Sequence, residues 1–272
     1  MKHDHPANGS GKGVLYVIAT PIGNLEDITL RSLRLLKSLN YLACEDTRTT
    51  RYLLQKLEVE TTARLFSYHE HNEEHAAEKI IELLRSGVEV GLVSDAGMPG
   101  VSDPGYRAVS RAVEEGFKVE VCPGPSAVQT ALVASGLPSS SYTFKGFPPR
   151  KEGKRKKFFE DEMNAPHTLI FFESKHRIIK TIESAREVLG DREAVVCIEL
   201  TKKFETIVRA GLDEMPKILE NTDLRGEITV LIKGARGEEI DSSDSTEEQA
   251  PREERISKYR QKQMMKEHDE ES

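Results

Sequence analysis

Long apolar runs and cysteine are scarce in this 272-residue sequence. The longest apolar stretches, such as Val14 to Ala19 and Thr168 to Phe172, are far shorter than the roughly 20 residues that cross a bilayer. The opening MKHDHPANGSGKG holds no apolar segment, which argues against a secretory signal. Three widely spaced cysteines (Cys44, Cys122 and Cys197) form no CxxC pair, which argues against a disulfide framework and a structural zinc site. We therefore expect a cytoplasmic protein with no membrane partner and no metal.

The net charge of −7 is unevenly spread along the chain. From residue 235 onward, seven Lys and Arg stand against twelve Asp and Glu, which leaves about −2 for everything before that point. This polar composition predicts an acidic disordered tail over 235–272, and a disordered N-terminus is expected over 1–12. Because the acidity is concentrated in the tail, net charge does not exclude nucleic acid as a partner of the folded part.

Short apolar runs alternate with amphipathic segments between residues 13 and 122, a pattern typical of a mainly parallel sheet with helices on both faces. The pattern restarts after LPSSS, so we expect an α/β fold with two domains, 13–136 and 137–234, and a hinge over 137–141. Strands are expected at 13–20, 41–44, 88–94, 118–122, 142–147, 167–172, 192–200, 205–211 and 225–234. Helices are expected at 30–39, 51–57, 74–87, 104–116, 126–136, 152–163, 175–190 and 213–221.

Three loops directly follow expected strands: TPIGN, SDAGMPGVSDPG and PGPSA. In an open α/β sheet such loops meet at the carboxyl ends of the strands, where ligands bind. Turns of this kind are also generally rich in Gly, Pro, Asp and Ser, whether or not they hold a ligand. These loops carry no Lys and no GxGxxG, so they suit a ligand with hydroxyls, an amine and one carboxylate better than a triphosphate. S-adenosylmethionine has that profile, and its sulfonium tolerates nearby acids.

The motifs LYVIATPIGNLEDITLR, CEDTRTTRYLL, HEHNEEH, VSDAGMPGVSDPG, PGPSAVQTALVASGLP, FKGFPPRK, FFESKHR, ELTKKFET and RGEITVLI follow one another in order. This series resembles the ribosomal RNA small subunit methyltransferase I family, whose members have the tetrapyrrole-methylase fold. The resemblance covers residues 13–234. It implies S-adenosylmethionine-dependent 2'-O-methylation of a cytidine ribose in 16S rRNA at the decoding centre. It also implies a cofactor in the cleft between two α/β domains, and a homodimer. Met98 and Ile198 depart from the family pattern, which has Thr and Arg there.

The resemblance and the loop positions together give a set of expected site residues. Methyl transfer to a ribose hydroxyl requires alignment and is helped by a base or by stabilisation of the developing alkoxide. For this chemistry we single out Glu199 as base and Lys202 as alkoxide stabiliser, both at a strand end, and Asn72 in YHEHNEEH. Charges at strand ends are more often simply solvated, and Asn72 is also a candidate helix cap. The expected cofactor-binding residues are Pro21, Gly23, Asn24, Asp95, Ala96, Gly97, Pro99, Asp103, Ser126, Ala127, Glu173, Gly226 and Glu227.

The stretch FKGFPPRKEGKRKKFF is the most basic in the chain and contains four phenylalanines. Cations give salt-dependent affinity for a nucleic-acid backbone, and exposed aromatic rings stack on bases. A solvated helix start with core phenylalanines is the alternative, and it fits Phe158 and Phe159 better. We expect 16S rRNA or the small ribosomal subunit to contact Arg150, Lys151, Lys154, Arg155, Lys156 and Lys157.

Two other functions stay open. One is a methylase of the same fold that acts on a tetrapyrrole or another small molecule, against which the basic segment argues. The other is a non-catalytic ribosome-assembly protein that has kept the fold.

Overall fold

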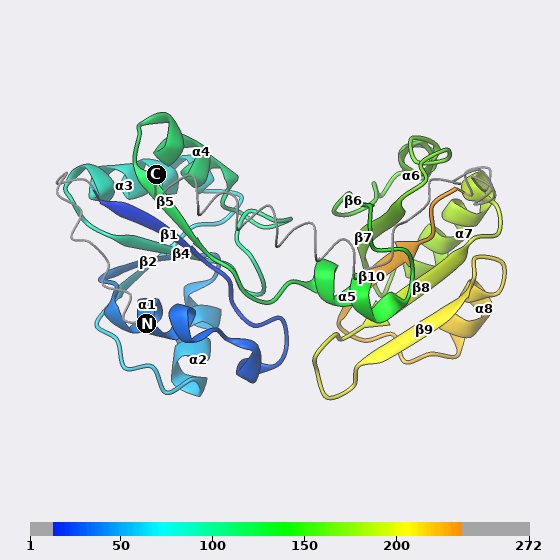
Figure 1. Ribbon diagram of the computed structural model, residues 1–272, viewed down its shortest axis with the longest axis horizontal. Helices are drawn as coiled ribbons and strands as arrows, with labels where there is room; N and C mark the ends of the chain where they lie inside the picture. The colour runs from blue at the N-terminus through cyan, green and yellow to red at the C-terminus, as the bar shows by residue number, and fades with distance from the viewer. Residues whose placement is uncertain (1–12, 236–272) are drawn as a thin grey trace, which may run out of the picture. The chain divides into compact units, whose positions relative to one another are not determined.

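The computed structural model describes residues 13–235, in which two five-stranded sheets are the main architectural units (Figure 1). The expected disordered N-terminus, and the expected acidic tail from residue 236 onward, lie outside these residues. Within the described part, no helix is long and apolar enough to cross a membrane. The α/β class predicted from the alternating pattern is confirmed.

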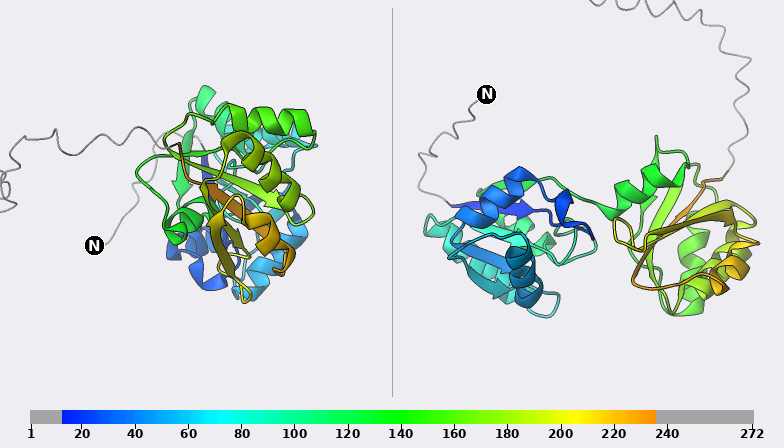
Figure 2. Two further views of the ribbon diagram at one scale, coloured as in Figure 1. Left: turned by 90° about the vertical axis from the view of Figure 1, so that its right-hand side faces the viewer. Right: turned by 90° about the horizontal axis from the view of Figure 1, so that it is seen from below.

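The first sheet is entirely parallel, with the order β3-β2-β4-β1-β5. Its helices cover both faces, as Figure 1 shows, and Figure 2 (right) views it from the side of α1 and α2, drawn in blue. Leu15, Ala43 and Leu92 pack toward α3 and α4, whereas Ile18 and Leu42 pack toward α1 and α2. The strands are β1 (Val14–Ile18), β2 (Tyr41–Cys44), β3 (Arg64–Ser67), β4 (Val90–Val93) and β5 (Lys118–Cys122). The helices are η1 (Leu25–Asp27), α1 (Leu30–Ser38), α2 (Thr47–Lys56), α3 (Glu73–Arg85) and α4 (Tyr106–Glu114).

The second sheet has the order β6-β7-β10-β8-β9 and is mostly antiparallel. Only the β6–β7 pair runs parallel. Helices α6, α7 and α8 cover one face, and α5 packs on the other. The strands are β6 (Tyr142–Phe144), β7 (Thr168–Ser174), β8 (Glu193–Ile198), β9 (Thr206–Gly211) and β10 (Glu227–Ile232). The helices are α5 (Ala127–Ser135), α6 (Glu152–Glu160), α7 (Ile178–Leu189) and α8 (Met215–Glu220).

Two features differ from the sequence-based expectations. Strand β3 was not predicted, because it is a short edge strand whose sequence, RLFS, is only half-buried. Helix α5 packs on the second sheet, where Val128 and Leu132 share one core cluster with Ile170 and Val195. The chain therefore passes from the first sheet to the second before α5, ahead of the expected hinge at 137–141. The division into two domains at residue 136 stays a prediction.

Candidate active site

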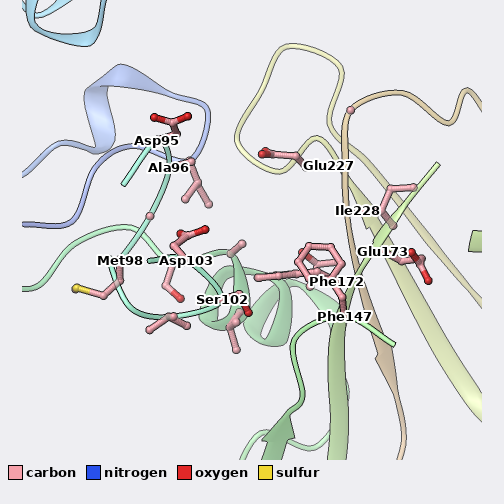
Figure 3. A pocket seen from close by; sticks show the side chains of 18 of the residues that line it. Asp95, Ala96, Met98, Ser102, Asp103, Phe147, Phe172, Glu173, Glu227 and Ile228 are labelled. Atoms are coloured by element: carbon pink, nitrogen blue, oxygen red, sulfur yellow. The ribbon is translucent and has the colours of Figure 1, made fainter. Parts of the chain in front are cut away.

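The three loops that follow β1, β4 and β5 meet at one cavity of about 470 Å³ (Figure 3). Ile22 comes from the first loop, residues 95–98 and 101–103 from the second, and Ser126 and Ala127 from the third. Two of the loops are joined directly, because Thr20 N donates to Gly97 O at 2.8 Å and Gly97 N donates to Thr20 O at 3.1 Å. The predicted convergence of the three loops is confirmed.

The loop from Ser94 to Gly105 is folded tightly on itself. Gly100 N donates to Pro104 O at 3.2 Å, and Val101 N donates to Met98 O at 3.2 Å. At Gly105, where φ is +155°, a Cβ atom would lie 2.7 Å from Gly100 N, so a side chain is excluded there. Ser102 has a φ of +64°, a conformation rare outside glycine and often found at functional sites. This fold holds Asp103 at the cavity.

A buried network behind this loop fixes the start of α4. The Tyr68 hydroxyl, 1% exposed, donates to Glu73 Oε1 at 3.0 Å and accepts from Ala108 N at 3.0 Å. Glu73 Oε1 also accepts from Gly105 N at 3.2 Å, and a carboxylate at a helix N-terminus is favourable. The YHEHNEEH motif thus supports the Asp103 loop through Tyr68 and Glu73. Sequence analysis missed both residues, because no short-range pattern links them to α4.

The side of the cavity that comes from the first sheet is acidic. Glu45, Asp95 and Asp103 line it, and no Lys, Arg or His between residues 13 and 235 is among the lining residues. Burial raises the pKa of Asp95, and the neighbouring Glu45 raises it further. The pKa of Asp103 rises from its ordinary value of 3.8 to about 7, first because of burial and then because of the charges on Glu45, Asp95 and Glu227. These acids create a local negative potential that favours a cationic ligand.

On the opposite side, the acids are paired. Lys202 Nζ lies 2.8 Å from Glu199 Oε1 and 2.9 Å from Glu227 Oε2, and Glu199 Oε1 also accepts from Glu227 N at 3.0 Å. Burial alone would raise the pKa of Glu199, but the Lys202 ammonium and the Glu227 N–H outweigh it and lower that pKa. Burial would likewise lower the pKa of Lys202, but its two carboxylate partners raise it. Lys202 therefore stays protonated, and Glu199 is a poor proton acceptor.

The loop after β1 contacts the loop after β8 directly. Asn24 N donates to Thr201 Oγ1 at 3.1 Å, and the Asn24 side chain accepts from Glu26 N at the start of η1. A Cβ atom at Gly23 would lie 2.4 Å from Lys202 Cγ and 2.9 Å from Leu200 O. Glycine at position 23 is therefore required by the close approach of the Lys202 loop.

The family model for Tetrapyrrole (Corrin/Porphyrin) Methylases matches residues 14–216. The ribosomal RNA small subunit methyltransferase I of Halalkalibacterium halodurans is 43% identical over 233 residues, which cover 86% of this chain and 80% of the relative. The protein of the same name from Bacillus subtilis is 42% identical over 250 residues, which cover 92% of this chain and 85% of the relative. The chain belongs to the ribosomal RNA small subunit methyltransferase I family.

Solved structures share the fold of this family member. The structure of diphthine synthase has a TM-score of 0.61 at 14% identity, covering 81% of this chain and 90% of that one. The structure of uroporphyrin-III C-methyltransferase from Thermus thermophilus, complexed with S-adenyl homocysteine, has a TM-score of 0.56 at 21% identity. It covers 80% of this chain and 97% of that one. At such identities the similarity establishes the fold alone, which is the tetrapyrrole-methylase fold that the motifs implied.

Nine of the thirteen residues that the methyltransferase I motifs suggested for the cofactor line the cavity: Asp95, Ala96, Gly97, Asp103, Ser126, Ala127, Glu173, Gly226 and Glu227. Pro21, Gly23, Asn24 and Pro99 are not among the lining residues. Glu173 lines the cavity, but its carboxylate is buried, pairs with Arg177 at 3.1 Å and accepts from Thr181 at 2.7 Å. In Figure 3 this carboxylate points away from Asp103 and Glu227. Glu173 is therefore a support for β7, not a free acceptor.

Of the three suggested catalytic residues of this family member, two lie together and the third, Asn72, lies apart from them. Glu199 and Lys202 pair beside the cavity, adjacent to its lining residues Gly226 and Glu227. Asn72 does not line the cavity, and its side chain accepts from His69 N at 2.8 Å and donates to Ser67 O at 3.1 Å. Because both ends of its amide are bonded to backbone, we withdraw the catalytic assignment of Asn72. Asn72 is the N-cap residue of α3, as the candidate capping role implied, but its side chain makes no cap hydrogen bond to the helix.

The two departures from the methyltransferase I pattern have different surroundings. Met98 lines the cavity at a position where the family has Thr. Ile198 is fully buried at the end of β8, within the core beneath α6 to α8. No group of three or more His, Cys, Asp or Glu between residues 13 and 235 is arranged to hold a metal ion.

The basic segment at α6 is only partly free. Arg155 is 8% exposed, and its guanidinium donates to Ser184 Oγ at 2.9 Å and to Arg150 O at 3.1 Å, so its assignment to RNA binding is wrong. Lys156 pairs with Glu152 and Glu187, and Lys157 pairs with Glu160 and Asp161. By contrast, three cations are exposed and form no ion pair with any residue between 13 and 235: Arg150, Lys151 and Lys154.

Proposed function

We propose that this chain transfers a methyl group from S-adenosylmethionine to the 2'-hydroxyl of a cytidine ribose in 16S rRNA, at the decoding centre of the small ribosomal subunit. Membership of the methyltransferase I family supports the rRNA substrate. The observation that carries the cofactor assignment is the cavity in which several acids and no cationic side chain converge. The choice of the decoding centre as the site of modification, and of the ribose 2'-oxygen as the methylated atom, rests on the family motifs.

The chemistry of the cavity fits this cofactor. A volume of about 470 Å³ lies within the roughly 300–1,000 Å³ range of small-molecule sites. Asp95 and Asp103 suit a sulfonium or an amine. Ser126 makes no side-chain cap bond at the start of α5, so its hydroxyl and the helix N-terminus are available to a carboxylate. The rings of Phe147 and Phe172, whose centroids lie 5.6 Å apart, supply an apolar wall for a base.

The cofactor supplies a methyl group on a positively charged sulfur, and the residues of the chain contribute alignment and charge. We assign Lys202 to the stabilisation of negative charge that develops on the ribose oxygen, because its two carboxylates keep it protonated. Glu199 holds the Lys202 ammonium in place. The contacts of Gly23 and Asn24 with residues 200–202 align the Lys202 loop with the cavity.

The exposed surface beside the cavity suits RNA. Phe147 lines the cavity and is 57% exposed, which leaves its ring accessible for stacking on a base. Arg150, Lys151 and Lys154 follow it directly in sequence and carry no pairing charge among the described residues. We assign these three cations to the phosphate backbone of the rRNA. We further propose that the protein acts as a homodimer in the cytoplasm.

The test is methyl transfer from labelled S-adenosylmethionine to extracted 16S rRNA, to small subunits and to tetrapyrroles, with the modified nucleoside identified by mass spectrometry. We expect 2'-O-methylcytidine at one site of the rRNA. Methylation of a tetrapyrrole alone would instead indicate a small-molecule methylase. Failure to bind S-adenosylmethionine in calorimetry would leave only a non-catalytic role in ribosome assembly. Gel filtration with light scattering tests the homodimer.

A further inference from the structure

The CEDTR motif contributes Glu45 to the cavity, but α2, the helix that begins within this motif, has no role in the reaction proposed above. Helix α2 (TRTTRYLLQK) contains Lys and Arg but no Asp or Glu, and the same is true of its neighbour α1 (LRSLRLLKS). Both helices cover one face of the first sheet, which lies below the strands in Figure 1. The cations of these two helices are Arg31, Arg34, Lys37, Arg48, Arg51 and Lys56.

The opposite face of the same sheet is charged differently. Helices α3 (EEHAAEKIIELLR) and α4 (YRAVSRAVE) carry charges of both signs. Arg85 pairs with Glu78 and Glu115, and Arg111 also pairs with Glu78. Opposite charges that pair in this way are typical of a helix surface that meets only solvent. Helices with cations alone instead produce a positive potential, which favours an anionic partner.

The cations of α1 and α2 differ in how far they are occupied within the protein. Arg31 donates to two atoms at the end of β5 and thereby fastens α1 to that strand. Arg48 pairs with Asp46 at the start of α2, although its side chain is 87% exposed. By contrast, Arg51 and Lys56 are exposed and form no ion pair among the described residues. Helix α2 therefore has cations that are free to bind a partner.

The exposed side of α2 combines these cations with an aromatic ring. Arg48, Arg51, Tyr52 and Lys56 recur at the three- and four-residue spacing that places side chains on one side of a helix, and we call them the α2 stripe. Tyr52 is 60% exposed, and Lys56 Nζ lies 5.4 Å from the centroid of its ring. The acids nearest in sequence lie beyond the two ends of the helix. Cations that contact phosphates and rings that stack on bases are the combination with which proteins bind single-stranded nucleic acid.

The α2 stripe begins next to the cavity. Asp46, the N-cap residue of α2, donates its backbone N–H to Asp95 Oδ1 at 3.2 Å, and both Asp95 and Glu45 line the cavity. From this point the ten residues of α2 extend for about 15 Å. An RNA strand whose target ribose enters the cavity therefore has α2 beside it on the side of the first sheet.

We propose that the α2 stripe binds the rRNA strand next to the target nucleotide, a conclusion that rests on the proposed function. Arg51 and Lys56 contact phosphates, and Tyr52 stacks on a base. This surface belongs to the first sheet, whereas Phe147 and the free cations of α6 belong to the second. A second copy of the chain is a poorer match for the stripe. In a two-fold dimer a surface meets its own copy, so like charges would face each other.

The experiment compares the wild type with two double variants, Arg51→Gln/Lys56→Gln on α2 and Lys79→Gln/Arg85→Gln on α3. Each variant removes one Arg and one Lys from an exposed helix surface, and Gln keeps a similar helix propensity. The α3 variant is the control, because its cations lie on the face that also carries acids. Filter binding at several salt concentrations gives the affinity for unmodified small subunits and for extracted 16S rRNA. Calorimetry gives the affinity for S-adenosylmethionine.

We expect the α2 double variant to bind subunits and rRNA about 10-fold or more weakly at about 0.1 M salt. The slope of its log affinity against log salt should fall by about 1.5–2, because two phosphate contacts are lost. The α3 double variant should change the slope by less than half as much. Affinity for S-adenosylmethionine should equal that of the wild type in both.

Tyr52→Leu separates stacking from charge. The variant keeps an apolar side chain but removes the ring, so affinity for subunits and rRNA should fall by about 5-fold or more. Because no cation is removed, the salt slope should stay that of the wild type. Wild-type affinity in this variant would refute the stacking role of Tyr52.

Several results would overturn the proposal. Equal losses in the two double variants, or no loss in either, would show that α2 is a solvated surface. A loss on subunits but not on extracted rRNA would indicate a ribosomal protein as the partner. A changed oligomeric state of the α2 variant in gel filtration would assign the stripe to a second copy, and a fall in its affinity for S-adenosylmethionine would place the effect at the cavity.

Failure of the proposed function gives a different result. A wild type that binds subunits but leaves their rRNA unmethylated would overturn the methyl transfer, whereas the affinities of the α2 and α3 variants would still test the RNA surface. Methylation by the wild type together with unchanged RNA affinity in the α2 variant would instead overturn the surface alone.

Discussion

The two sides of the cavity carry acids in opposite electrostatic states. On the side of the first sheet, Asp95 and Asp103 have raised pKa values and no cationic partner among the described residues. On the side of the second sheet, Glu173 is paired with Arg177, and Glu199 and Glu227 are paired with Lys202. The sequence alone does not distinguish the two sets, because both consist of carboxylates near strand ends at the same cavity.

The difference separates residues that bind and react from residues that build the site. Unpaired acids in a partly buried cavity cost stability, because like charges repel and burial disfavours ionisation. Such a cost is commonly retained at functional sites. Paired acids stabilise the loops that carry them when both partners are present. Removing an acid should therefore have opposite effects on stability on the two sides.

The largest expected effect is a contrast between Asp103→Asn and Glu173→Gln. The pKa of Asp103 in the folded protein, about 7, lies above its ordinary 3.8. The folded state therefore binds more protons between those pH values, and the free energy of unfolding falls as pH rises through this window. At pH 8 we expect Asp103→Asn to be more stable than the wild type by on the order of 2–4 kcal/mol.

Glu173→Gln should instead destabilise the protein by about 3 kcal/mol, because it leaves the Arg177 charge without its carboxylate partner, with only the Pro148 carbonyl as acceptor among the described residues. Urea denaturation at pH 5 and pH 8 measures both variants. Destabilisation of similar size in both would remove the distinction between the two sides.

Asp95→Ala tests the binding role of the acidic side. The variant removes a charge that faces a cationic ligand and also leaves Asp46 N without its acceptor. We expect affinity for S-adenosylmethionine to fall by about 10- to 100-fold, or about 1.4–2.7 kcal/mol. Calorimetry measures the affinity, with the exposed Asp27→Ala on η1 as the matched control. Equal affinities for Asp95→Ala and Asp27→Ala would refute the assignment.

Tyr68→Phe tests the support behind the Asp103 loop. The variant leaves the buried Ala108 N without its partner and removes one bond to Glu73, so we expect a loss of about 1–3 kcal/mol in the free energy of unfolding. Tyr16→Phe, which loses only an exposed bond to Glu89, should stay within about 0.5 kcal/mol of the wild type. The result that contradicts this account is an equal loss in both variants.

The smallest expected effect concerns α6, where free and paired cations are adjacent. Replacing Lys151 and Lys154 with Ala should weaken RNA binding and reduce the slope of log affinity against log salt by about 1.5–2. The same change at Lys156 and Lys157, which are paired within the protein, should reduce it less. Filter binding at several salt concentrations gives both slopes. A larger change for the paired lysines would reverse the assignment.

Most of the fold could be predicted from periodicity. The buried strands β1, β4, β7 and β8 are apolar runs, and the helices between them have clear amphipathic spacing. Edge strand β3 was not predicted, because the half-buried sequence RLFS has no such apolar run. The sheet on which α5 packs was not predicted either. Helix α5 is apolar around much of its circumference, so its sequence does not show which sheet buries it.

The candidate site could be predicted as a set of loops but not as a set of roles. Strand order brings the ends of β1, β4 and β5 together, so adjacency followed from topology. The roles depend on pairs distant in sequence, such as Glu199 with Glu227 and Arg155 with Ser184. No local pattern encodes such pairs, so sequence analysis grouped the buried Arg155 with exposed cations and suggested the paired Glu199 as the base.

The most direct test of the account is the calorimetric titration of the wild-type protein with S-adenosylmethionine, followed by incubation of the complex with unmodified small subunits. We predict one binding site per chain and, on adding subunits, 2'-O-methylation of a single cytidine in 16S rRNA. Absence of binding, or binding without methylation of the rRNA, would contradict it.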